Sequence, residues 1–323
     1  MSMRMKTTLP SLLACFCVIL GVATTVAQTP KAHRINRAIE LLEQGQPIYY
    51  TGSHSGTIGT FEQGKQDAQT WADYISYDME AAPYDVAGLS AYMQGLAAGG
   101  PTRSGHRTPA VIVNVAVRGT DEATVRANMW MFEQVLATGV HGILLAHGTT
   151  PGAARAFVEA VRLPNHEQGT GKGLLQDGRR GVHGFATAAK VWGVSTEEYA
   201  QKADVWPLNP NGEIILGLKI EDKYALANAE ENLKVPGIAF AEWGPGDMAL
   251  SLGVRGPDAA KNPLMQAARA RVFAACKANK IFFLNSMNVN DVIDMIKEGV
   301  MVGPASQEAA EIGRKYTKRQ MPW

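Results

Sequence analysis

Eight short apolar runs, each followed by a segment of helical character, constrain the fold of this chain more than any other feature. Helical spacing is clearest where Val125, Met129, Phe132 and Leu136 recur every three or four residues. Strands that alternate with helices indicate a parallel sheet, and eight of them favour a closed barrel over an open sheet. The expected strands are residues 48–51, 74–77, 110–117, 142–146, 214–220, 237–241, 281–284 and 300–303. We therefore predict an α/β protein with a single-domain (β/α)₈ TIM-barrel fold.

The composition fits a globular protein and excludes two classes of function. Of the 323 residues, 46% are hydrophobic and 19% are charged, which is ordinary for a folded domain. The formal charge of +1 gives no sign of a surface that binds nucleic acid. No Gly-x-Gly-x-x-Gly motif follows the first expected strand, which argues against a dinucleotide-binding protein.

The first 27 residues have the pattern of a cleavable signal peptide. Arg4 and Lys6 form a short positive region, an apolar stretch covers residues 12–22, and small residues precede a cleavage point after Ala27. The apolar stretch is too short for a membrane anchor. We therefore expect a mature domain of residues 28–323 that is periplasmic or secreted and has no membrane contact. It keeps one cysteine, Cys276, for which we expect a buried apolar role.

Polar residues stand at the ends of most expected strands. In a (β/α)₈ barrel the active site forms at the carboxyl ends of the strands, so these residues are the first candidates for function. They include His54, Asp78 and Glu80, Asn114, His147, Lys219 and Glu221, residues 244–247, and Asn285.

Two segments resemble the HpcH/HpaI aldolase and citrate lyase superfamily. The first is residues 218–222, Leu-Lys-Ile-Glu-Asp, followed by Val-Pro-Gly-Ile at residues 235–238. The second is residues 243–253, which contain a Gly-Pro-x-Asp motif at residues 244–247. A weaker match is Arg-Gly-Val-His-Gly at residues 180–184. The resemblance extends over roughly residues 35 to 305, and the Gly-Pro-x-Asp motif is its most specific part.

The resemblance implies a class II pyruvate aldolase, in which Glu221 and Asp247 are the two carboxylate ligands of Mg²⁺, Mn²⁺ or Co²⁺. Hard divalent cations prefer oxygen ligands, which agrees with this assignment. The implied reaction is aldol or retro-aldol chemistry on a 2-oxo acid such as pyruvate or on a hydroxy-oxo acid. Members of this superfamily usually form homo-oligomers, which we expect here as well.

Three positions depart from the pattern of that family. Its second strand ends in Asp-x-Glu-His, whereas this chain has Ala81 after Asp78 and Glu80. The third strand of the family commonly carries an arginine, where this chain has Asn114. A glutamine common two residues before the metal-binding glutamate is Lys219 here.

Other residues are candidates to replace these missing groups. Three histidines could serve as the base because imidazole titrates near neutral pH, and His147 and His54 are favoured over His183 because strands fix them. Arg118 could replace the missing arginine. Backbone amides near Gly181, together with Gly246 of the Gly-Pro-x-Asp motif, could orient the substrate.

Lys219 leaves two mechanisms open. Alternation along a strand places it on the same face as Glu221, so its amine faces the expected cavity. A desolvated amine could form a Schiff base with a carbonyl substrate. The favoured interpretation is a salt bridge or a contact to the substrate carboxylate, because a neighbouring anion keeps the amine protonated.

The sequence thus supports a metal-dependent lyase as the main hypothesis. The loss of the family histidine and arginine supports an alternative, a non-catalytic descendant that still binds metal and oxo acid. An acyl-CoA lyase ranks last because no basic loop for the nucleotide is evident.

Overall fold

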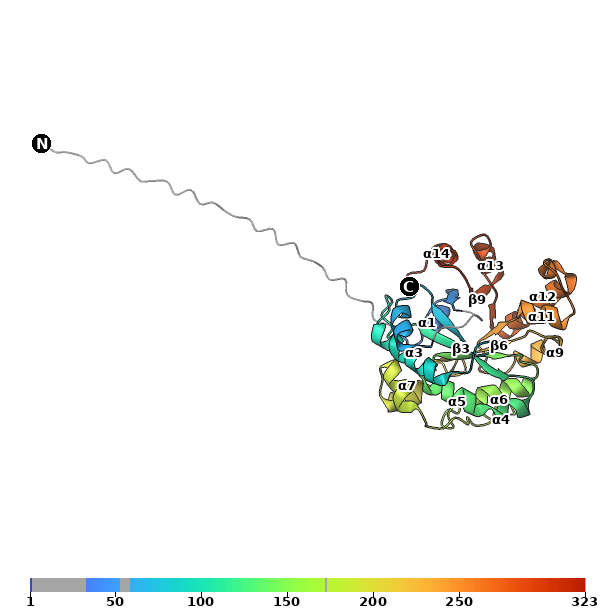
Figure 1. Ribbon diagram of the computed structural model, residues 1–323, viewed down its shortest axis with the longest axis horizontal. Coiled ribbons are helices and arrows are strands. Elements are labelled where there is room, and N and C mark those ends of the chain that lie inside the picture. The colour runs from blue at the N-terminus through green and yellow to red at the C-terminus, as the bar shows by residue number, and fades with distance from the viewer. Residues whose placement is uncertain (2–32, 53–58, 172, 323) are drawn as a thin grey trace.

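A computed structural model describes residues 1, 33–52, 59–171 and 173–322 of the chain. Its strands are parallel, and helices surround them (Figure 1). The strands are β1 (Ile48–Thr51), β2 (Tyr74–Asp78), β3 (Ala110–Arg118), β4 (Gly142–Ala146), β5 (Val205–Trp206), β6 (Ile214–Lys219), β7 (Phe240–Glu242), β8 (Phe282–Leu284) and β9 (Val300–Pro304).

The sheet closes on itself, as the sequence predicts. The order β4-β3-β2-β1-β9-β8-β7-β6 is closed by pairing of β4 with β6, which gives a ring of eight strands. The short β5 pairs with β6 and lies outside this ring. All eight expected strands are present, and the (β/α)₈ prediction is confirmed.

The largest boundary error concerns β7, which was expected at residues 237–241 and covers Phe240–Glu242. Gly237 has a φ of 97°, and the backbone N–H of Ile238 donates to the carbonyl of Val235 at 3.4 Å. These residues therefore form a turn, and the strand begins after it.

Helices follow most of the strands. The main ones are α1 (Arg37–Glu43), α2 (Phe61–Asp67), α3 (Val86–Gly99), α4 (Glu122–Ala127), α5 (Met129–Ala137), α6 (Pro151–Val161), α7 (Phe185–Trp192), α8 (Thr196–Lys202), α9 (Lys223–Ala227), α10 (Ala229–Asn232), α11 (Pro245–Ser251), α12 (Pro263–Asn279), α13 (Val292–Glu298) and α14 (Gln307–Tyr316). Side chains that accept hydrogen bonds from backbone amides cap many of their N-termini, for example Asn36 before α1. None of the helices in the described residues combines the length and apolar character that crossing a membrane requires.

Alternation along the strands separates two cores. In β3, Val111, Val113 and Val115 face outward and pack with the surrounding helices. Ile112 faces the barrel interior, where it belongs to a smaller core that includes Phe240. The apolar side of α1 belongs to this inner core, so the amino-terminal end of the barrel is filled and the opposite end is left for a site.

The structure tests the expectation for Cys276 but not the expectation of a signal peptide. Cys276 is a buried free thiol in α12, which confirms its expected apolar role. The predicted signal peptide lies outside the described residues, except for Met1.

His141, just before β4, makes the stability of the fold depend on pH. Burial lowers the pKa of His141 from its ordinary value of 6.5 to about 3, and its Nδ1 accepts from the backbone N–H of Val111 at 3.2 Å. Between pH 6.5 and about 3 the unfolded chain therefore binds a proton that the folded chain does not.

The free energy of unfolding should consequently fall by up to about 1.4 kcal/mol for each pH unit below 6.5 on account of this histidine. Urea unfolding of the wild type and of His141→Asn across this range measures the effect, since asparagine keeps an acceptor for the Val111 amide. The slope should be shallower in the variant, and equal slopes would show that His141 is not the cause.

Candidate active site

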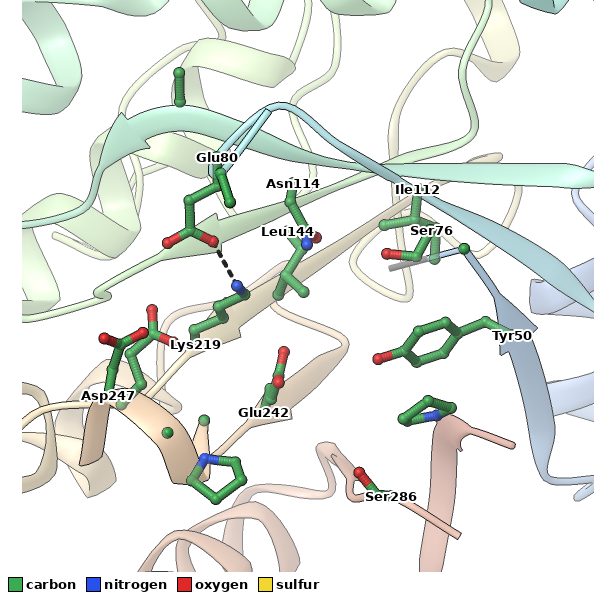
Figure 2. A pocket seen from close by; sticks show the side chains of 18 of the residues that line it. Tyr50, Ser76, Glu80, Ile112, Asn114, Leu144, Lys219, Glu242, Asp247 and Ser286 are labelled. Carbon is green, nitrogen blue, oxygen red and sulfur yellow. Dashed lines mark hydrogen bonds and ion pairs between the residues drawn. The ribbon is translucent and has the colours of Figure 1, made fainter. Parts of the chain in front are cut away.

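A cavity of about 860 Å³ opens at the carboxyl ends of the barrel strands. Its lining comes from the ends of β1, β2, β3, β4, β6, β7 and β9 and from the segments that follow several of them (Figure 2). Four carboxylates and two cationic side chains take part in the lining; they are Glu80, Glu221, Glu242, Asp247, Lys219 and Arg118. The position agrees with the site predicted from the strand ends.

Glu221 is the most deeply placed of the predicted metal ligands. It lies two residues after β6 and is 2% exposed. The backbone N–H of His147 donates to its Oε1 at 3.0 Å. Burial raises the pKa of Glu221 to about 7, against the opposing effects of Lys219 and His147. A cation beside this carboxylate would therefore stabilise its charged form.

Gly244 brings the Gly-Pro-x-Asp segment against Glu221. Its φ is 45°, and a β-carbon at this position would lie 2.3 Å from Cβ and 2.6 Å from Oε2 of Glu221. Only glycine permits this close approach in the left-handed conformation. Asp247 follows in the first turn of α11 and lines the same cavity, where its side chain is exposed.

Glu80 and Lys219 form an ion pair inside the cavity, with Nζ 2.5 Å from Oε2 (Figure 2). Asp78 shapes the turn that presents Glu80, because its Oδ1 accepts from the backbone N–H of Glu80 at 2.8 Å and of Ala81 at 3.3 Å. Burial alone would lower the pKa of Lys219, but the carboxylates around it raise that pKa above its ordinary value. Lys219 is therefore an ammonium, which supports the salt-bridge interpretation over the Schiff base.

His147 has an unusual backbone and two strong side-chain contacts. It follows β4 with a φ of 49°, which is rare for a residue other than glycine and is characteristic of functional sites. Arg118 Nη2 lies 2.5 Å from its Nε2, and Asp222 Oδ2 lies 3.0 Å from its Nδ1. The hydrogen bond to Asp222 raises the pKa of His147, whereas burial and Arg118 lower it. Since the guanidinium can only donate, Nε2 accepts and Nδ1 carries the proton that Asp222 accepts.

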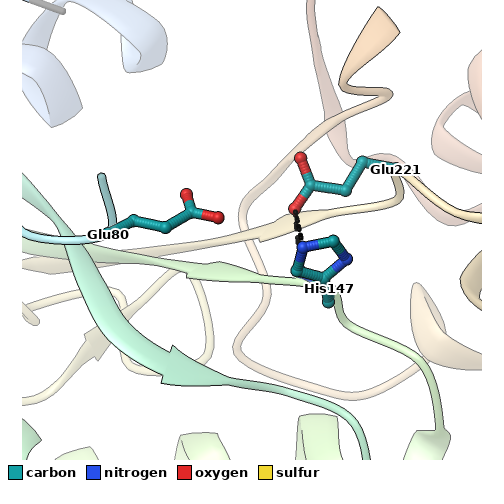
Figure 3. A group of neighbouring side chains, drawn as sticks. All are labelled: Glu80, His147 and Glu221. Carbon is teal, nitrogen blue, oxygen red and sulfur yellow. Dashed lines mark hydrogen bonds and ion pairs between the residues drawn. The ribbon is translucent and has the colours of Figure 1, made fainter. Parts of the chain in front are cut away.

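Glu80, His147 and Glu221 offer ligand atoms that lie within 4.8 Å of one another (Figure 3). The carboxylates of this group suit a hard divalent cation, whereas both ring nitrogens of His147 are engaged by Arg118 and Asp222. The lining has four carboxylates and two cationic side chains, and a divalent cation would balance the resulting excess of two negative charges. The residues present therefore fit a divalent metal, with Glu221 and Asp247 as the carboxylates that the sequence motif assigns to it.

Of the remaining candidate residues, two line the cavity and one lies outside the described residues. Asn114 and Gly246 line the cavity, and Ala81 lies there too, where the resemblance expects histidine. His54 lies outside the described residues.

The structure does not bring Gly181 and His183, which the sequence analysis expected at the site, to this cavity. Neither lines the cavity, and the N–H of Gly181 donates to Glu133 on α5 at 3.3 Å. The N–H of Arg180 donates to the carbonyl of Arg162, just after α6, at 2.9 Å. Helices of a (β/α)₈ barrel run opposite to the strands, so this contact holds the loop near the amino-terminal end of the barrel.

Sequence reasoning missed several residues of the site, among them Asp222, Glu242, Tyr50, Tyr74 and Ser76. Strand alternation could have found Glu242, because it lies two residues after the inward-facing Phe240. No local signal indicated that Asp222 contacts His147, since 75 residues separate them.

Gly244→Ala should destabilise the mouth of the barrel. The new methyl group would meet the Glu221 side chain at 2.3 Å in a backbone conformation that alanine disfavours, at a cost of about 1–3 kcal/mol. Chemical denaturation measures this cost. Gly246→Ala is the matched control, because a β-carbon there has no atom within 4 Å. Equal stability of the two variants would contradict the packing of Gly244 on Glu221.

The chain is similar in sequence to known aldolases. The family model described as HpcH/HpaI aldolase/citrate lyase matches residues 67–308. A hydroxypyruvate/pyruvate aldolase of Sagittula stellata is 28% identical over 205 residues, which cover 64% of this chain and 66% of that protein. A 2-keto-3-deoxy-L-rhamnonate aldolase of Klebsiella pneumoniae is 32% identical over 142 residues, which cover 44% and 45%. The matched part thus spans about half to two thirds of the length of these relatives.

Solved structures support the fold. An HpcH/HpaI aldolase/citrate lyase family protein of Burkholderia cenocepacia aligns with a TM-score of 0.64 at 21% identity, over 88% of this chain and 97% of that chain. An HpcH/HpaI aldolase of Desulfitobacterium hafniense aligns with a TM-score of 0.60 at 18% identity, over 87% and 96%.

Proposed function

The chain belongs to the HpcH/HpaI aldolase/citrate lyase family, and we propose that it is a metal-dependent carbon–carbon lyase acting on a 2-oxo acid such as pyruvate or on a hydroxy-oxo acid. The observation that carries this proposal is the packing of the Gly-Pro-x-Asp segment on buried Glu221, which brings Asp247 to the same cavity. The two relatives described above, both aldolases, support the same reaction class.

Glu221 and Asp247 would hold the metal, which we propose to be Mg²⁺, Mn²⁺ or Co²⁺. When bound, such an ion supplies Lewis-acid chemistry, which is the stabilisation of negative charge that develops on a substrate oxygen. The ion pair of Lys219 with Glu80 holds a second positive charge beside this position.

We propose that His147 is the base that transfers the proton. Its Nδ1 proton is held by Asp222, so the lone pair of Nε2 is the basic position, and Arg118 covers it. Arg118 lines the cavity and its side chain is long, so binding of a substrate carboxylate by its guanidinium would expose Nε2. In the addition direction, Nε2 takes a proton from C3 of pyruvate, C3 bonds to the aldehyde carbon, and the aldehyde oxygen receives a proton.

Ala81 in the cavity wall favours the second candidate, a protein that binds metal and oxo acid without catalysing the reaction. The two candidates differ in whether the pyruvate methyl protons exchange with solvent.

Exchange of the pyruvate methyl protons in D₂O, followed by NMR with Mg²⁺ present, tests the proposal. We expect exchange in the wild type, and a loss of about 100-fold or more in Glu221→Gln, because the amide removes one carboxylate ligand. Glu62→Gln, a change on the exposed face of α2, is the control and should exchange at the wild-type rate.

Exchange that survives both chelation and Glu221→Gln would contradict the metal mechanism. If the wild type binds pyruvate but its methyl protons do not exchange, the protein is a binding protein and not a lyase.

We propose further that residues 1–27 are removed and that the protein acts outside the cytoplasm; the pattern of Arg4, Lys6 and Ala27 supports this. Amino-terminal sequencing of the periplasmic or secreted protein should begin at Gln28. An intact amino terminus in the cytoplasmic fraction would contradict export.

We also propose a homo-oligomer, for which the exposed side chains of Leu250 and Leu264 offer apolar surface; they are 71% and 56% exposed. Measurement of the molecular mass in solution distinguishes a monomer from a homo-oligomer.

A further inference from the structure

Three arginines and one aspartate gather at the amino-terminal end of the barrel, opposite the candidate active site. Asp73 directly precedes β2, Arg37 begins α1, Arg314 belongs to α14 and Arg319 follows that helix. We call these four residues the arginine cluster. We propose that the arginine cluster binds a chloride ion, which ties the first and last helices of the chain to the barrel.

The three guanidinium groups meet at a single carboxylate oxygen. Oδ1 of Asp73 lies 3.2 Å from Nη2 of Arg37, 3.1 Å from Nη2 of Arg314 and 2.8 Å from Nη1 of Arg319. The other oxygen, Oδ2, accepts from the backbone N–H of Tyr49 at 2.9 Å. Because one oxygen serves three cations, the three guanidinium groups lie close to one another.

The arginine cluster carries an excess of positive charge away from water. The side chains of Arg37 and Asp73 are fully buried, that of Arg319 is 1% exposed and that of Arg314 is 9% exposed. Three cations and one carboxylate leave two positive charges in excess. Burial and the repulsion of the other two arginines lower the pKa of Arg37 to about 10, against the attraction of Asp73. Buried charges without a partner are costly, so a second anion would stabilise the folded chain.

Glu40 also attracts Arg37, but its carboxylate is engaged elsewhere. Its Oε2 accepts from the backbone N–H groups of His33 and Arg34 at 3.1 and 2.9 Å, and it lies 3.0 Å from Nε2 of His106. Glu40 therefore reduces the excess charge of the arginine cluster only from outside it.

Unpaired donors are the independent sign of a ligand. Five guanidinium nitrogens are buried without a hydrogen-bond partner in the part of the chain that the structure describes; they are Nε and Nη1 of Arg37, Nε and Nη1 of Arg314, and Nε of Arg319. The guanidinium carbons of Arg314 and Arg319 lie 5.6 and 5.7 Å from the ring centroid of Tyr49. A ring attracts the face of a guanidinium, whereas the N–H groups lie in its plane and still need an acceptor. An anion that accepts from these donors would remove the cost of leaving them unpaired.

The available space favours a monatomic anion. The cavities of about 860, 770 and 280 Å³ are lined by other residues, and the arginine cluster opens into none of them. A phosphate or an organic acid would need such an opening. Chloride needs little room and accepts hydrogen bonds from any direction, which matches N–H donors that come from separate side chains.

A chloride ion in this place would act on stability. The arginine cluster already connects distant parts of the chain, since Nη2 of Arg37 donates to the carbonyl of Pro322 at 2.9 Å and Nη2 of Arg314 donates to that of Trp71 at 2.7 Å. The unfolded chain does not assemble the three guanidinium groups. Chloride should therefore bind the folded chain alone and raise its stability with concentration.

Thermal unfolding of the full chain in sodium chloride and in sodium gluconate tests the proposal. The two salts are compared at the same concentration and ionic strength, and gluconate is too large for a buried site of this kind. We expect the melting temperature of the wild type to be higher in chloride by about 2 °C or more.

Two variants remove donors from the arginine cluster. Arg314→Met removes one guanidinium, and Arg319→Lys keeps a positive charge near Asp73 but removes the Nε donor; each should reduce the chloride shift by about half or more. Arg319→Lys serves if Arg314→Met does not fold. Arg271→Met is the matched control, because Arg271 is 43% exposed and pairs with Glu230, and it should keep the full shift. General effects of the two salts act on all these proteins alike, so the difference from the wild type measures the site.

Diffraction from crystals grown in sodium bromide locates the ion, because bromide replaces chloride and scatters anomalously. An anomalous peak in contact with at least two guanidinium groups of the arginine cluster is the expected result. The proposal is overturned by the absence of this peak, by equal melting temperatures of the wild type in the two salts, or by a chloride shift that either cluster variant retains in full.

Discussion

The burial of the Glu221 carboxylate is the interaction on which the mouth of the barrel depends. The carboxylate is held between the backbone N–H of His147 and the backbone of Gly244, and burial raises its pKa to about 7. A buried acid of this kind is stable in its charged form only with cations or donors beside it. Lys219 supplies part of that compensation, and we propose that a divalent cation held together with Asp247, which lines the same cavity, supplies the rest.

Closure of the barrel brings these groups together. Pairing of β4 with β6 aligns Leu145 with Leu218, so the residues that follow the two strands, His147 and Glu221, become neighbours although 74 positions separate them. The N–H of Gly148 then donates to the carbonyl of Lys219 at 2.9 Å, which fixes the backbone at this junction. His147 lies at this junction in a left-handed conformation, and its ring contacts Asp222 on the segment after β6.

Much of the fold followed from the sequence because it depends on local patterns. Alternation and helical spacing located all eight barrel strands, and the Gly-Pro-x-Asp motif located the segment that packs on Glu221. Features that depend on contacts between distant strands were not predictable in this way. The partners of His147 are one example, since neither Arg118 nor Asp222 is near it in sequence. The loop around Gly181 is another, because its anchoring by the backbone of Arg162 leaves no trace in the local pattern.

Direct measurement of metal binding tests the central claim, that Glu221 and Asp247 hold a divalent cation. Titration with Mn²⁺, followed by electron paramagnetic resonance, reports binding without any turnover. The account predicts one site in the wild type and a loss of affinity of about tenfold or more in both Glu221→Gln and Asp247→Asn. Wild-type affinity in both variants, or no binding to the wild type, would contradict it.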